Sequence, residues 1–225
     1  MKPLDFSAPR VVGTVVTGAG LAKLARPPQG IGLVEVRADA LLQDGLLLAE
    51  ILHALRRRKV PVLLTCRIPE EGGLYAWERG ERKETLRHLL PHAEAFDLEL
   101  ASLPSLKAEA AAARQAGKKL VLSVHSLAEA PSPAALRRWA AALRKARPDV
   151  AKIAAKAETA AHLRALARLF LEESERPGPA WAVMGTGPQA AASRIALGAL
   201  GTALRYGYLD KPAAPNQPSA ASLVD

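Results

Sequence analysis

Asp149-Val150-Ala151-Lys152-Ile153-Ala154 is a short and almost wholly apolar stretch, bounded by Pro148 and by a helix-like run that starts at Glu158. These features indicate a buried strand of a parallel sheet. Lys152 stands in the middle of it, although an unpaired charge is costly to bury. Such a lysine either extends to solvent at the end of the strand or loses its proton. A lysine with a depressed pKa is a nucleophile toward carbonyl carbon atoms.

Apolar segments of similar length recur at regular intervals along the chain. The predicted strands cover residues 11–17, 31–37, 60–67, 95–100, 119–125, 149–154, 180–184 and 202–206. The helical patterns between them cover residues 21–25, 41–58, 78–93, 105–116, 133–146, 158–173 and 189–200. Eight strands that alternate with helices over short connections predict a (β/α)8 TIM barrel, with residues 1–225 as a single α/β domain. A doubly wound sheet is the alternative, but Gly18-Ala19-Gly20 provides only part of the glycine fingerprint expected after its first strand.

Composition narrows the class of protein. A hydrophobic content of 49% over 225 residues is enough for one large core, and an aromatic content of 4% means that this core is aliphatic. Cys66 is the single cysteine, which excludes an internal disulfide and favours a reducing compartment, so we expect a cytoplasmic protein. The first residues form no long apolar segment and no run of 18 apolar residues occurs, so neither a signal peptide nor a membrane span is expected.

The net charge of +9 comes from 31 Lys and Arg against 22 Asp and Glu. Such a balance permits nucleic-acid binding, and a basic binding module is one alternative class of protein. However, the basic residues are spread along helices, as in 56–59 and Arg137-Arg138, and no aromatic-basic motif or zinc spacing occurs. A basic field also suits an enzyme with an anionic substrate, because it steers the anion inward. We therefore expect a small-molecule substrate, with no nucleic acid and no metal.

Polar residues gather where the predicted strands end, and in a barrel the catalytic groups lie at the carboxyl ends of the strands. Glu35, Arg37, Arg67 and His125 lie at such ends, Lys152 lies on the sixth strand, and Arg194 begins the helix after the seventh. His125 ends an apolar strand, whereas the other four histidines fall inside predicted helices and are expected at the surface. A single arginine at a strand end is usually a solvated cap. Together these groups predict a site for a multiply oxygenated anion, with cations beside Lys152 and arginines that bind a carboxylate in bidentate fashion.

Seven motifs occur in the order typical of one family and span nearly the whole chain. They are Val34-Glu35-Val36-Arg37-Ala38-Asp39; Thr65-Cys66-Arg67 followed by Glu71-Gly72-Gly73; Asp97-Leu98-Glu99-Leu100; Ser123-Val124-His125; Asp149-Val150-Ala151-Lys152-Ile153-Ala154; Met184-Gly185 with Ser193-Arg194; and Ala214-Pro215-Asn216-Gln217. Through these motifs the chain resembles type I 3-dehydroquinate dehydratase, a Schiff-base hydro-lyase of the shikimate pathway.

The resemblance implies a role for each matching residue. Lys152 forms the Schiff base with the ketone of 3-dehydroquinate, and His125 takes a proton from the adjacent carbon and then protonates the departing hydroxyl. Glu71 orients His125 and raises its pKa. The remaining residues are implied to bind substrate: Glu35, Arg37 and Arg67 the ring hydroxyls, Arg194 and Gln217 the carboxylate, Thr14 the floor of the site, and Tyr206 the ring. The resemblance implies no cofactor, and a homodimer.

The chain departs from the family pattern at several points. Lys156-Ala157 stands where the family has Met-Pro, the segment from Met184 to Arg194 is about two residues longer, and Ala213 and Asn216 replace a serine and a glycine. The nearest rival is another lysine-dependent barrel enzyme, an aldolase or transaldolase that acts on sugar phosphates. Such an enzyme needs backbone amides for a phosphate after strands seven and eight, and residues 185–187 are the candidate.

Overall fold

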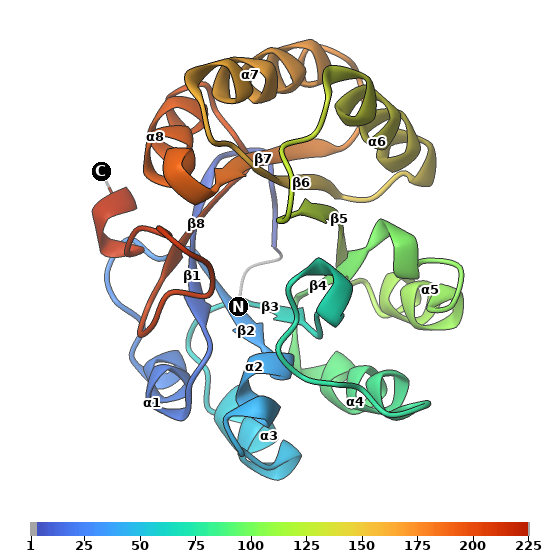
Figure 1. The fold of residues 1–225 in the computed structure, drawn as a ribbon. Helices are drawn as coiled ribbons and strands as arrows, with labels where there is room; N and C mark the ends of the chain where they lie inside the picture. Colours follow the sequence, from blue (N-terminus) through green and yellow to red (C-terminus); the bar gives the residue numbers. More distant parts are fainter. Residues whose placement is uncertain (1–3, 225) are drawn as a thin grey trace.

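The computed structural model describes residues 4–224, and its eight parallel strands form a barrel surrounded by helices (Figure 1). Neighbouring strands pair in the order β7-β6-β5-β4-β3-β2-β1-β8. The strands are β1 Arg10–Val15, β2 Leu33–Arg37, β3 Val62–Thr65, β4 Ala95–Glu99, β5 Lys119–Ser126, β6 Val150–Lys156, β7 Ala180–Thr186 and β8 Leu204–Tyr208. Strands and helices alternate along the chain, so the predicted (β/α)8 barrel is confirmed.

The barrel is nearly closed, and its seam lies between β7 and β8. The backbone N–H of Ala203 donates to the carbonyl of Trp181 at 2.8 Å. The N–H of Val183 donates to the hydroxyl of Thr202 at 3.0 Å. These two bonds join the strands across the seam, which reduces the unpaired edge that an open sheet would expose.

Helices form the outer ring of the molecule in Figure 1. The α-helices are α1 Gly18–Leu21, α2 Ala38–Gln43, α3 Leu48–Arg56, α4 Glu81–Leu89, α5 Lys107–Gln115, α6 Pro133–Ala146, α7 Ala160–Ser174 and α8 Ala190–Ala199. Short 3-10 helices cover η1 Ala22–Ala25, η2 Pro69–Glu71, η3 Leu90–His92, η4 Leu100–Ser102, η5 Gly187–Gln189 and η6 Ala221–Leu223. Between residues 4 and 224, none of these helices is long and apolar enough to cross a membrane.

The single helix predicted for residues 41–58 is wrong, because the structure has two helices there. Gly45 lies between α2 and α3 with a φ of +86°, a conformation that glycine adopts without the steric cost of a side chain. The helix α3 then begins afresh, and the carboxylate of Glu50 accepts a hydrogen bond from the backbone N–H of Leu47 at 2.7 Å. The break places α2 directly after β2, so that Asp39 follows the strand end closely.

The buried apolar residues form two clusters. The larger one lies between the strands and the helices. The smaller one lies inside the barrel and includes Leu4 and Phe6, which precede β1, residues near the starts of the strands, and Ala154, Met184 and Tyr206 farther along their strands. Its members near the strand starts fill the amino end of the barrel interior. These members form an apolar floor, and the polar side chains farther along the strands lie above it.

Candidate active site

The polar groups form a layer directly above this floor. Side chains two residues apart on a strand face the same way, so each polar residue follows a floor residue by two positions. The six pairs are Val12 and Thr14, Leu33 and Glu35, Leu63 and Thr65, Ala95 and Asp97, Val121 and Ser123, and Val150 and Lys152. The strand register places Ser123 of β5 beside Lys152 of β6. The layer thus brings one ammonium and two carboxylates together inside the barrel.

Lys152 is buried within this layer, with 3% of its surface exposed. Its Nζ donates to Oδ2 of Asp97 at 2.8 Å and lies 3.8 Å from Oε1 of Glu35. On a further side, Nζ lies 4.2 Å from the centroid of the Tyr206 ring, within the range of a cation–π contact. The charged groups in direct contact with Lys152 are therefore carboxylates, and the nearby cation Arg67 binds the other oxygen of Asp97.

Glu35 is held by hydroxyl groups on the neighbouring strands. The hydroxyl of Thr14 donates to Oε2 at 3.1 Å, and that of Thr65 donates to Oε1 at 2.9 Å. The amide nitrogen of Gln217, from the segment after β8, lies 3.5 Å from the same Thr14 hydroxyl. Thr14 therefore joins the floor of the site to the C-terminal segment.

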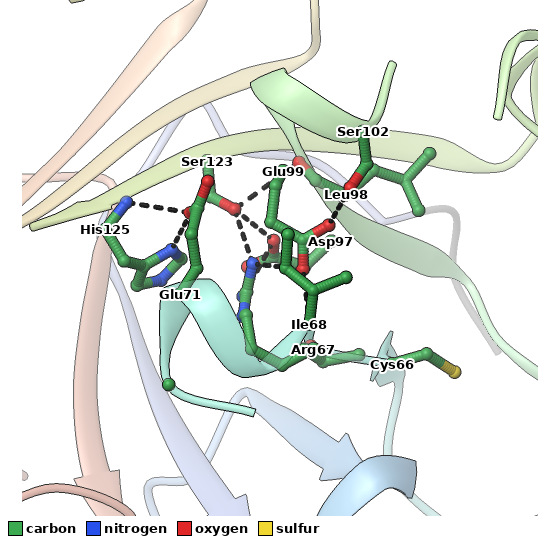
Figure 2. Close-up of polar contacts among 12 residues, drawn as sticks. Cys66, Arg67, Ile68, Glu71, Asp97, Leu98, Glu99, Ser102, Ser123 and His125 are labelled. Carbon is green, nitrogen blue, oxygen red and sulfur yellow. Dashed lines mark hydrogen bonds and ion pairs between the residues drawn. The ribbon is translucent and has the colours of Figure 1, made fainter. Parts of the chain in front are cut away.

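Arg67 lies at the centre of a buried ion-pair network (Figure 2). Its Nη2 lies 2.9 Å from Oδ1 of Asp97, and its Nη1 lies 3.2 Å from Oε1 of Glu99 and donates to the hydroxyl of Ser123 at 2.8 Å. Burial alone would raise the pKa of Asp97, but Arg67 and Lys152 together hold it far below the ordinary range of an aspartate. Asp97 is thus a fixed anion at the base of the site.

Arg37 connects the end of β2 to the loop that carries Glu71. Its Nε and Nη2 donate to the two carboxylate oxygens of Asp39 at 2.9 and 2.7 Å, and Nη2 also donates to the carbonyl of Gly72 at 3.0 Å. Asp39 in turn accepts hydrogen bonds from the backbone N–H groups of Arg67 and Leu74. One carboxylate at the start of α2 therefore holds the segment after β3 beside the end of β2.

His125 and Glu71 form a pair at the mouth of the barrel. Oε2 of Glu71 lies 2.8 Å from Nδ1 of His125 and accepts the backbone N–H of the same residue at 2.9 Å (Figure 2). Burial, together with the positive charges of Arg67 and Lys152, lowers the pKa of His125 well below its usual value. This net direction is opposite to the one expected from Glu71 alone. Burial likewise raises the pKa of Glu71 to about 7.

Arg194 lies on α8 and is also buried, with 4% of its surface exposed. Its Nε donates to the carbonyl of Tyr206 at 2.8 Å, and its Nη1 donates to the carbonyls of Gly185 and Ala190 at 2.8 and 2.9 Å. Within residues 4–224, no carboxylate forms an ion pair with it. Burial lowers its pKa to about 10. The site therefore contains a buried guanidinium that is oriented by carbonyl groups and has room for an external anion.

All ten residues predicted for the site line one cavity of about 70 Å³ at the carboxyl ends of the strands. They are Thr14, Glu35, Arg37, Arg67, Glu71, His125, Lys152, Arg194, Tyr206 and Gln217. The longer segment before Arg194 has not removed this residue from the cavity. Lys156 is directed elsewhere, since its Nζ donates to the carbonyl of Ala128 at 2.9 Å and pairs with Glu158 at 3.0 Å.

Several residues of the site were given no role from the sequence, although Met184, Asp97 and Ser123 stand in its motifs. Leu127, Met184 and Thr186 line the cavity, Asp97 binds Lys152 within the same layer, and Ser123 donates to Asp97. The signal for Asp97 was its position two residues after an apolar floor residue, the same offset that Lys152 has. Among the described residues, no group of three or more His, Cys, Asp or Glu side chains is arranged to hold a metal ion.

Comparisons with known proteins agree with this geometry. The family model for type I 3-dehydroquinase matches residues 17–225. A 3-dehydroquinate dehydratase of Aquifex aeolicus is 30% identical over 200 residues, which cover 88% of this chain and 87% of that protein. A bifunctional 3-dehydroquinate dehydratase/shikimate dehydrogenase of Arabidopsis thaliana is 31% identical over 200 residues, and these cover 87% of this chain but only 32% of that longer protein.

Solved structures show the same fold. The crystal structure of 3-dehydroquinate dehydratase from Geobacillus kaustophilus superposes with a TM-score of 0.84 at 20% identity and covers 96% of this chain and 89% of that one. The Aquifex aeolicus crystal structure gives a TM-score of 0.77 at 26% identity over 96% of this chain and 95% of that one. The resemblance inferred from the sequence motifs is thereby confirmed, and the chain belongs to the type I 3-dehydroquinase family.

Proposed function

We propose that this chain is a 3-dehydroquinate dehydratase that converts 3-dehydroquinate to 3-dehydroshikimate and water through a Schiff base on Lys152. The observation that carries the proposal is the content of one cavity: a buried lysine, a histidine–glutamate pair and an arginine that has no carboxylate partner within residues 4–224. A ketone, an acidic C–H next to it and a carboxylate are the three features of the substrate that these groups match.

Covalent catalysis starts at Nζ of Lys152. The ammonium releases one proton, the resulting amine adds to the ketone carbon, and the ketone oxygen leaves as water. Return of the released proton gives a protonated imine, which withdraws electrons from the adjacent carbon. That carbon becomes acidic enough for a general base of moderate strength. Hydrolysis of the imine after elimination regenerates the lysine.

His125 transfers the proton. Its Nδ1 is occupied by Glu71, so Nε2 is the ring atom that remains for the substrate. A neutral imidazole accepts the proton from the carbon next to the imine, and the imidazolium then donates a proton to the departing hydroxyl, which leaves as water. The lowered pKa of His125 supports this order of events, because the ring is neutral before the reaction starts.

The other residues bind and orient the substrate. We assign the carboxylate to Arg194 and Gln217, which approach the cavity from α8 and from the segment after β8. Glu35, Arg37 and Arg67 face the ring hydroxyls, Thr14 lies at the floor, and the ring of Tyr206 packs against the substrate. Carboxylate binding by a buried guanidinium is favourable because the charge-assisted bonds form away from water.

The rival aldolase or transaldolase function requires free backbone amides near residues 185–187. The N–H of Gly185 already donates to the hydroxyl of Ser193 at 2.9 Å, and its carbonyl accepts from Arg194. The structure therefore favours a carboxylate over a phosphate at this position. A homodimer, a cytoplasmic location and the lack of a nucleic-acid partner stay predictions, which light scattering, fractionation and nucleic-acid retention would check.

A trapping experiment tests the proposed function. The protein is incubated with 3-dehydroquinate and borohydride, and intact-mass and peptide measurements locate any reduced adduct. We expect one adduct on the peptide that contains Lys152, together with formation of 3-dehydroshikimate when borohydride is absent. Absence of both would overturn the proposal, and an adduct on Lys156 would show that Lys156 is the nucleophile in place of Lys152.

A further inference from the structure

Asp97 has the closest polar contact to the nitrogen that the mechanism uses. It is fully buried on β4, in the same layer above the barrel floor as Lys152 on β6. Its Oδ2 accepts a hydrogen bond from Nζ of Lys152 at 2.8 Å. By contrast, Glu35 lies 3.8 Å from this nitrogen, beyond hydrogen-bond distance. Any chemistry at Nζ therefore takes place against the carboxylate of Asp97.

The second oxygen of Asp97 is fixed by two other residues. Oδ1 accepts the hydroxyl of Ser123 at 2.6 Å and lies 2.9 Å from Nη2 of Arg67. Arg67 is itself anchored by Glu99 at 3.2 Å (Figure 2). Because all of these groups are buried, the carboxylate has one orientation, with Oδ2 left for the lysine. A rigid acceptor of this kind determines where Nζ lies.

We propose that Asp97 is a positioning residue that holds the nitrogen of Lys152 in both of its cationic forms, the resting ammonium and the protonated imine. The proposal deepens the proposed function and rests on it. Both forms carry one positive charge, so the same carboxylate pairs with the nitrogen before and after the covalent bond forms.

The reaction balances without a proton on Asp97. The ammonium has three protons and the protonated imine has one. The two protons that the nitrogen loses leave with the ketone oxygen as water. Asp97 stays ionised throughout, because Arg67 and Ser123 continue to bind its other oxygen. Asp97 therefore needs only to keep its place while the nitrogen exchanges two protons for a bond to carbon.

Other charged and titratable groups face the same nitrogen. They are Glu35 on β2, Arg67 after β3, His125 on β5 and Tyr206 on β8. A test must therefore separate Asp97 from a general change of charge. Glu99 provides the matched control, because it is equally buried on β4 and pairs with Arg67 but does not contact Lys152.

The experiment compares Asp97→Asn with Glu99→Gln. Lys152 is modified with formaldehyde and cyanoborohydride at a fixed pH, and peptide mass spectrometry follows its methylation relative to the exposed Lys107. In Asp97→Asn the nitrogen loses a charge-assisted hydrogen bond, so methylation of Lys152 relative to Lys107 should rise by roughly 10-fold or more. It should stay unchanged in Glu99→Gln.

The outcomes separate the two proposals. Unchanged methylation of Lys152 in a folded Asp97→Asn protein, or an equal rise in Glu99→Gln, overturns the role of Asp97. If Asp97→Asn does not fold, Asp97→Glu retains the charge but displaces it by one methylene. This variant should lose turnover at least about 10-fold, since a displacement of this size impairs alignment; wild-type turnover overturns the role. Methylation needs no substrate, so a failure of the dehydratase reaction alone leaves this test intact.

Discussion

One carboxylate oxygen of Glu71 contacts His125 twice: it lies 2.8 Å from Nδ1 of the ring and accepts the backbone N–H at 2.9 Å. The two contacts come from different parts of one residue, so they fix both the position of the strand end and the rotation of the ring. Glu71 lies in η2, which follows β3, whereas His125 lies on β5. The loop after β3 therefore determines which ring nitrogen of His125 faces the cavity.

The first prediction concerns the stability of Glu71→Gln. Burial raises the pKa of Glu71 to about 7 in the folded protein, against a reference value of 4.5. A carboxyl group whose pKa is higher in the folded than in the unfolded state stabilises the fold at pH values below its unfolded pKa. This contribution is lost as the pH rises through the folded pKa of about 7. Glutamine cannot ionise, so at about pH 8 the variant should be more stable than the wild type. Its free energy of unfolding should be higher by an amount on the order of 1–3 kcal/mol.

Denaturant unfolding at about pH 5 and about pH 8 checks this prediction, and the advantage of Glu71→Gln should be much smaller at the lower pH. The exposed neighbour provides the control, since Glu70→Gln should change stability little at either pH. A Glu71→Gln protein that is less stable than wild type at the higher pH would show that its ionised form is favoured by the fold.

Replacement of Lys152 tests the nucleophile. Lys152→Ala should abolish both the borohydride adduct and dehydration, because no other amine lines the cavity among the described residues. The fold should persist, since Asp97 retains Arg67 and Ser123 as partners. Lys156→Ala is the matched control and should keep its adduct, because Lys156 bonds to Ala128 and Glu158 instead. An adduct that forms in Lys152→Ala contradicts the assignment.

Arg194 should contribute mainly to substrate binding. Its removal should raise the Michaelis constant by an amount equivalent to about 2–5 kcal/mol, because the substrate carboxylate loses a desolvated partner. Steady-state kinetics of Arg194→Ala check this expectation. As a control on the ligand side, an analogue without the carboxylate should bind the variant and the wild type equally. An unchanged Michaelis constant would assign the carboxylate to another residue.

The barrel was predictable because its signals are local. Each strand is a short apolar run, and α6 has the predicted bounds because Pro133 and the Ser132 cap mark its start. The single helix predicted over residues 41–58 is interrupted at Gly45, whose positive φ is not determined by the surrounding apolar pattern. Strand ends differ from the prediction in both directions, since β1 and β3 end two residues early, at Val15 and Thr65. By contrast, β6 continues to Lys156, where pairing with β7 adds stability that the sequence pattern does not show.

The residues that line the cavity were predictable one by one, whereas their electrostatics were not. A strand-end position identified His125, and an ammonium inside an apolar strand identified Lys152, since the fold brings such positions together. The charge that faces Lys152 depends on which side chains share a layer across different strands, and Asp97 lies 55 residues away in sequence. The direction of the His125 pKa similarly depends on Arg67 and Lys152, which only the closed barrel places nearby.

The last prediction is that His125 performs the proton transfer. The imine on Lys152 acidifies the adjacent C–H, but a base must accept that proton and an acid must protonate the leaving hydroxyl. His125 is the histidine that lines the cavity, and its Nε2 is directed away from the Glu71 contact. His125→Ala should therefore lower turnover by about 10²–10⁴-fold while Lys152 still reacts with the ketone. The imine should accumulate and be visible by intact mass after reduction.

His88→Ala, at an exposed position on α4, should leave turnover unchanged. A His125→Ala enzyme with near-normal turnover would mean that another group is the base.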